Sequence, residues 1–92
     1  VFSMFGGEEE LVRLRFKDHL IGVVMDRFGK DVTIFRKEGG YFEIYTRVVL
    51  SSQFYGWIFA LGDGARILSP ETAVRGMMEQ IRQARKCYEA EE

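Results

Sequence analysis

The stretch from Ser51 to Gly62 constrains the fold of this chain more than any other. Its ends are marked for a short helix. A serine hydroxyl at the start can accept a hydrogen bond from a free backbone N–H, and glycine at the end takes the left-handed conformation without strain. Between these ends, apolar side chains recur at the spacing of one helical face: Phe54, Trp57, Ile58 and Leu61. We therefore predict that this face packs on the core of the domain.

Tyr55 and Phe59 form a second apolar stripe beside that face. A helix that is apolar nearly all round cannot lie on an open surface, so this stripe needs a cover. Two alternatives remain open: the last helix or Phe2 and Phe5 cover it within the chain, or a second copy of the chain does so. With Trp57, these two residues are the candidate interface of a homodimer.

The bulk composition is that of one small globular domain. The 92 residues are 47% hydrophobic and 29% charged, and no apolar run reaches the ~18–20 residues of a membrane helix, so no membrane partner is expected. The net charge of -1 argues against a nucleic-acid-binding domain, which usually has a basic excess. The single cysteine, Cys87, excludes an internal disulfide and agrees with a cytoplasmic location.

Hydrophobic periodicity and turn residues predict seven elements. Asp18 is expected to cap the first helix, Gly39-Gly40 to form a hairpin turn, and Ser69-Pro70 to begin the last helix. In chain order, the predicted elements are strand 8–16, helix 18–28, strands 31–37 and 41–50, helix 52–61, strand 65–68 and helix 70–88.

The first six elements follow the order of the split βαβ arrangement. The predicted fold class is therefore α+β: a ferredoxin-like βαββαβ sandwich with an additional C-terminal helix, over residues 8–88. Residues 1–7 are interpreted as a connector from an upstream domain, because they end in a glycine pair that breaks regular structure. Residues 89–92 are interpreted as a frayed acidic tail at the negative end of the last helix.

No catalytic constellation is predicted. His19 and Cys87 are the only histidine and cysteine, and one is placed at a helix start while the other is placed near the chain end. No cluster with zinc-ligand spacing is visible, and the glycine pairs match neither a phosphate-binding loop nor a dinucleotide fingerprint. We therefore expect no metal, no cofactor and no enzymatic activity, and a function that rests on binding and assembly.

One face of the sheet is expected to be open. Apolar residues alternate along the strands and should point at the helices: Val12, Leu14, Phe16, Val32, Ile34, Phe42, Ile44 and Val48. The opposite face then shows the candidate ligand-binding residues Arg13, Arg15, Phe35, Tyr45 and Arg47. Aromatic rings among arginines resemble an RNA-recognition surface, so a nucleotide or single-stranded nucleic acid is the effector that this face would suit. Against this, the return strand departs from the RNA-recognition signature, Glu43 adds a negative charge, and such cross-strand pairs stabilise any sheet.

Two runs resemble one known family. They are residues 20–32, LIGVVMDRFGKDV, and residues 53–62, QFYGWIFALG, the second being followed by ILSPE at 67–71. These runs are similar to the C-terminal extension, called WCX, of bacterial WYL-domain transcriptional regulators. The opening strand VRLRF at 12–16 and the late Tyr88 also fit, so the resemblance covers nearly the whole chain.

The resemblance implies a regulatory module of a cytoplasmic transcription factor that contributes to dimerisation and to effector response. Members of that family place a winged helix-turn-helix and a WYL domain before the extension. Contact with DNA is therefore expected only through upstream domains, and the homodimer is the expected partner state. The alternative function is a stand-alone module that binds a small molecule or single-stranded nucleic acid on the open sheet face.

Overall fold

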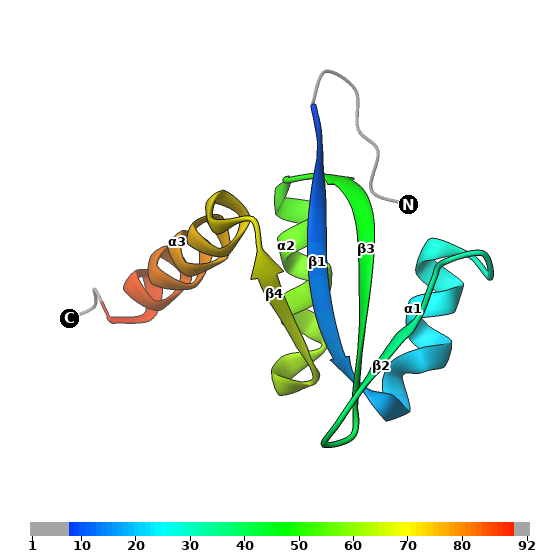
Figure 1. The fold of residues 1–92 in the computed structure, drawn as a ribbon. Helices are drawn as coiled ribbons and strands as arrows, with labels where there is room; N and C mark the ends of the chain where they lie inside the picture. The colour runs from blue at the N-terminus through cyan, green and yellow to red at the C-terminus, as the bar shows by residue number, and fades with distance from the viewer. Residues whose placement is uncertain (1–7, 90–92) are drawn as a thin grey trace.

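The computed structural model describes residues 8–89, which form a four-stranded antiparallel sheet with three helices (Figure 1). The strands are β1 (Glu9–Lys17), β2 (Phe35–Lys37), β3 (Tyr41–Val49) and β4 (Ala65–Ser69), in the sheet order β2-β3-β1-β4. The helices are α1 (Ile21–Phe28), α2 (Ser52–Ala60) and α3 (Glu71–Glu89), and short 3₁₀ turns η1 (Asp18–Leu20) and η2 (Gly62–Gly64) precede α1 and β4. The predicted ferredoxin-like fold with an additional C-terminal helix is confirmed.

The core lies between the sheet and the first two helices. Alternate residues of β1 point into it, and Leu14 and Phe16 face Ile44 and Phe42 across the pair with β3. All four of these side chains are fully buried, and the rings of Phe16 and Phe42 stack 5.5 Å apart. Burial of each such side chain stabilises the fold by about 1.5–3 kcal/mol, so this double row anchors the sheet.

Helix α2 follows the capping residues predicted for it. The Ser51 hydroxyl accepts a hydrogen bond from the Phe54 backbone N–H at 3.2 Å, and Gly62 has a φ of 63° just beyond the helix. The indole of Trp57 meets the rings of Phe16 and Phe28 edge-on at 6.0 and 5.5 Å. Trp57, on the predicted inward face of α2, is therefore packed between β1 and α1.

Three predicted boundaries were wrong. The strand predicted over 31–37 is paired only over Phe35–Lys37, because the Val32 N–H bonds back to the Gly29 carbonyl in a turn after α1. Asp18 does not cap α1; it lies in η1, and its carboxylate pairs with Arg36 at 3.4 Å. The last helix begins at Glu71, since Ser69 still belongs to β4.

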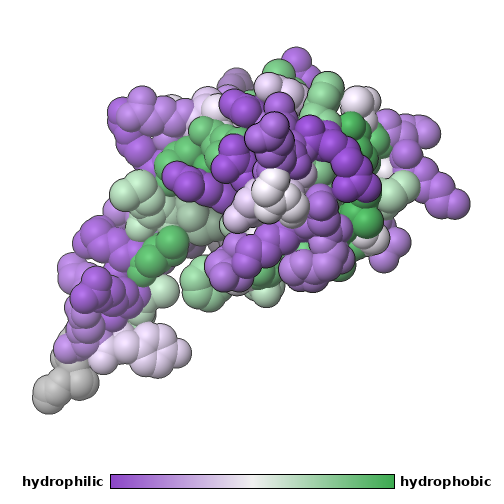
Figure 2. Space-filling model, turned by 60° about the horizontal axis from the view of Figure 1, so that its bottom comes forward, coloured by the Kyte–Doolittle hydropathy of each residue, from purple (hydrophilic) through white to green (hydrophobic). Residues whose placement is uncertain are grey.

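Helix α3 leaves the body of the domain after its first turns. Ala73 is its one fully buried residue, and every residue from Met78 to Glu89 is exposed. Figure 1 shows α3 running away from the sheet beside β4, and Figure 2 shows it as an arm projecting from a largely hydrophilic body. The predicted connector at 1–7 and the last three residues of the predicted tail lie outside the described residues, whereas Glu89 ends α3.

Candidate functional site

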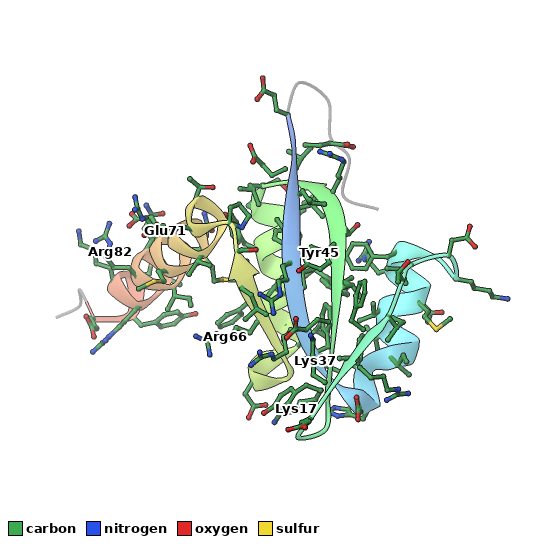
Figure 3. All side chains as sticks on the ribbon, in the orientation of Figure 1. Lys17, Lys37, Tyr45, Arg66, Glu71 and Arg82 are labelled. Atoms are coloured by element: carbon green, nitrogen blue, oxygen red, sulfur yellow. The ribbon has the colours of Figure 1, made fainter. Side chains whose placement is uncertain are left out.

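Two surfaces of the described residues stand out. The first is the face of the sheet turned away from α1 and α2, which we call the open sheet face. Pleating and register place side chains of all four strands on it: Leu11, Arg13, Arg15, Lys17, Phe35, Lys37, Tyr41, Glu43, Tyr45 and Arg66, with Glu9 at the start of β1 and Arg47 further along β3. In Figure 3 the labelled Lys37 and Tyr45 lie over the sheet, and Arg66 lies beside β4 at its edge. All five residues predicted for a ligand surface therefore share this face.

Glu43 is the centre of the open sheet face. Its carboxylate accepts hydrogen bonds from Arg13 Nε at 2.8 Å and from Arg15 Nε at 3.1 Å, one on each oxygen. A terminal nitrogen of each guanidinium adds an ion pair, at 2.8 and 3.0 Å. Glu43 is only 1% exposed. One buried carboxylate thus holds two partly exposed arginines side by side.

The ionisation of Glu43 follows from these contacts. Burial is the largest single influence and raises the pKa of the carboxyl, but the hydrogen bonds from Arg13 and Arg15 oppose it, and the pKa lies below its ordinary value. The same contact with Glu43 raises the pKa of Arg13. The group is therefore a fixed carboxylate at neutral pH. It does not repel a ligand as an isolated charge would, because it is already matched by two cations.

An aromatic pair adjoins the arginines. Phe35 and Tyr45 meet edge to face with ring centres 5.9 Å apart, and they are 43% and 51% exposed. Tyr41, the third ring of the face, is covered by the Arg15 guanidinium at 5.6 Å from its centre. The open sheet face therefore has a charged part and a free aromatic part next to it.

The charges of the chain are unevenly distributed. The open sheet face carries Arg13, Arg15, Lys17, Lys37, Arg47 and Arg66, six of the 13 lysines and arginines. Within its strands the opposing acids are Glu43 and, at the start of β1, Glu9. Lys17 also pairs with Asp63 at 3.3 Å. The chain-wide net charge of -1 therefore hides a face on which cations outnumber acids.

The second surface is an apolar groove between α2 and α3, which we call the α2–α3 groove. Phe59, Met77 and Ile81 line two adjoining hollows of about 290 and 160 Å³. Phe59 is 66% exposed and Met78, on the rim, is 64% exposed. The groove continues onto the exposed part of α3 through Met78, Ile81 and Ala84.

The structure separates the three residues predicted for an interface. Tyr55 is covered within the chain: it is 6% exposed, and its hydroxyl donates to the Ala73 carbonyl at 3.1 Å. Trp57 is half-buried toward α1, where the Arg27 guanidinium lies 5.6 Å from its ring centre. Phe59 lines both hollows of the α2–α3 groove, whereas Tyr55 reaches only the smaller one and Trp57 reaches neither.

Sequence reasoning missed several residues of the open sheet face, whereas periodicity already predicts the apolar stripe of the last helix that lines the groove. Alternation along the strands assigns Lys17, Lys37 and Arg66 to this face once the register is known. However, β2 and β4 are too short for the sequence to set that register. Met78 and Ile81 lie on the apolar stripe of the last helix, a signal that sequence periodicity does contain.

The described residues offer no visible catalytic or metal centre. Within 8–89 no group of three or more His, Cys, Asp and Glu side chains is placed to hold a metal ion. His19 in η1 and Cys87 near the end of α3 are both exposed. No helix in the same range is long and apolar enough to cross a membrane.

The described residues form a small α+β module with a basic sheet face and an apolar groove between two helices. The chain belongs to the WCX domain family, whose model matches residues 8–85. A search of curated proteins finds no match. Family membership supports a regulatory type of module rather than a catalytic one.

Proposed function

We propose that this domain is the C-terminal regulatory and dimerisation module of a WYL-type helix-turn-helix transcriptional regulator, acting without catalysis. DNA contact would come through upstream domains, and effector response would be passed on through this one. The observation that carries the assembly role is the α2–α3 groove with the uncovered apolar stripe of α3. The WCX family membership supports the regulatory context.

The proposed partner at the groove is a second copy of the chain. Phe59, Met78 and Ile81 are 66%, 64% and 45% exposed, so water surrounds apolar area that an interface would bury. A two-fold axis presents the same patch on both subunits, so the projecting α3 of each copy can lie in the groove of the other. Salt bridges within α3, such as Glu79–Arg82 at 2.6 Å, make the surface on either side of the apolar residues polar.

Sedimentation of Phe59→Arg tests the dimer. We expect the wild type to dimerise at tens of micromolar or below and Phe59→Arg to be monomeric, because a guanidinium in the groove has no counter-charge there. Phe35→Arg is the matched control, since Phe35 is also an exposed aromatic but lies on the open sheet face. Ile81→Arg, on the exposed part of α3, provides a second variant whose effect does not depend on α2.

The outcomes separate the alternatives. A wild type that stays monomeric would defeat the proposal, and a dimer that survives both groove variants would place the interface elsewhere. Loss of the folded far-UV circular dichroism signal in Phe59→Arg would show that Phe59 belongs to the core of its own domain. The regulatory context is tested by the complete reading frame, which must encode a helix-turn-helix upstream.

A further inference from the structure

We propose that the open sheet face binds one nucleotide-sized aromatic anion, with its phosphate at Arg13 and Arg15 and its ring on the Phe35–Tyr45 pair. This site goes beyond the assembly role proposed above. It is distinct from the α2–α3 groove, so it holds for a monomer as well as for a dimer.

The arginine pair is prepared for an anion. Glu43 engages Nε and one terminal nitrogen of each guanidinium, and its single charge balances only one of the two cations. Each guanidinium has a second terminal nitrogen outside this contact with Glu43, and the two side chains are 36% and 37% exposed. Because Glu43 already orients both guanidiniums, a ligand does not have to order them, which favours binding. Guanidinium groups suit the oxygens of a phosphate in particular.

The aromatic pair supplies a surface for a ring. Phe35 and Tyr45 are both about half exposed, and their edge-to-face contact holds each ring in place. A planar heterocycle stacking on an exposed aromatic side chain gains binding energy whatever its identity. The exposed pair therefore favours a ligand that is aromatic as well as anionic.

The register sets the size of the ligand. Tyr45 lies directly opposite Arg13, while Phe35, Glu43 and Arg15 follow one another across three neighbouring strands. Neighbouring strands lie about 4.8 Å apart, so the aromatic pair and the arginines are separated by about 5–10 Å. That span matches one nucleotide from base to phosphate. A longer single-stranded nucleic acid would need further exposed rings on which its other bases could stack, but the Arg15 guanidinium covers Tyr41.

Titration of the isotope-labelled chain with adenosine 5′-monophosphate, followed by NMR, tests this site. We expect the largest amide shifts on β1, β2 and β3, and binding at least about tenfold weaker for adenosine or inorganic phosphate alone. Arg13→Gln should weaken binding about tenfold and Phe35→Ala about fivefold or more.

Matched controls lie on the helices. Arg75→Gln removes one exposed cation of α3, and Tyr88→Ala removes one exposed aromatic ring of the same helix; both should leave the affinity unchanged. Shifts confined to the α2–α3 groove would overturn the proposal, as would phosphate binding equal to that of the nucleotide. If a single-stranded deoxyadenylate octamer binds and the mononucleotide does not, the proposed site for one nucleotide is wrong, and the face binds an oligonucleotide instead.

Discussion

Glu43 joins residues that are far apart in the sequence into one site. Its partners Arg13 and Arg15 are 30 and 28 positions away, and the three meet only because β1 and β3 pair in one register. A carboxylate that looked like an obstacle to anion binding is the group that positions two arginines for it. At this scale the chemistry of the sheet face depends on one buried acid.

Substituting Glu43 should change both the stability of the fold and its dependence on pH. Glu43→Gln keeps the shape of the side chain but removes the negative charge that pairs with two guanidiniums. We therefore expect the free energy of unfolding to fall by about 1–3 kcal/mol at pH 7. Because the pKa of Glu43 is lowered in the folded state, its contribution is complete above the unfolded value of about 4.3 and is lost as the pH falls toward the folded value. Thermal melts from pH 7 to 3 should therefore fall more steeply for the wild type than for the variant.

The control for this melt series is Glu79→Gln. Hydrogen bonds from Arg82 and Gln83 lower the pKa of Glu79 to about 2, but this carboxylate is exposed on α3 and solvent screens it. We expect its effect on the melting temperature to be smaller than that of Glu43→Gln. If the melting temperature falls equally with pH in Glu43→Gln and in the wild type, the contacts of Glu43 with Arg13 and Arg15 do not stabilise the fold.

Helices α2 and α3 come into close contact at Gly76. A methyl group on Gly76 would lie 2.0 Å from the Tyr55 hydroxyl oxygen, which the bond to Ala73 holds in place. Gly56, in the middle of α2, has open space where a methyl group would go. Glycine is therefore required at position 76 of α3 for close packing. At position 56 of α2 it has no packing role and only lowers helix propensity.

Alanine at the two positions should act in opposite directions. We expect Gly56→Ala to stabilise the domain by about 0.5–1 kcal/mol, because alanine is the better helix former. Gly76→Ala should destabilise it by about 1–3 kcal/mol, since the clash outweighs the same propensity gain. Urea unfolding of both variants measures the difference. A stabilised Gly76→Ala would show that the contact between Tyr55 and α3 is loose.

At the scale of the whole molecule, α3 is attached at one end only. Its first turns pack on Tyr55 and β4, whereas its later half extends beyond the body (Figure 1). Short helices without tertiary packing are marginal in water. A partner that covers the stripe would therefore stabilise this half of α3 as well as bury it.

Hydrogen exchange along α3 should depend on protein concentration. In dilute solution we expect the amides after Ile81 to exchange much faster than those of β1 and β3, because local opening there breaks no tertiary contact. Raising the concentration should slow them if a second copy binds the groove, and Phe59→Arg should remove that effect. Slow exchange of these amides at every concentration would contradict the picture of an uncovered helix end.

The sequence by itself determined the features that depend on near neighbours. The order of elements, the Ser51 cap, the glycines after the helices and the alternation that buries Val12, Leu14 and Phe16 are local, because capping and pleating involve residues a few positions apart. Strand parity also placed Arg13, Arg15, Phe35, Tyr45 and Arg47 on one face.

Only the tertiary structure decided which polar and aromatic groups meet. The direction in which α3 leaves β4 covers Tyr55 and leaves Phe59 exposed, although both belong to the same stripe of α2. The register of β1 against β3 turned Glu43 from an isolated charge into the support of two arginines. Both outcomes depend on contacts between distant segments, and the free energy of such contacts is set by packing of the whole domain rather than by any local pattern.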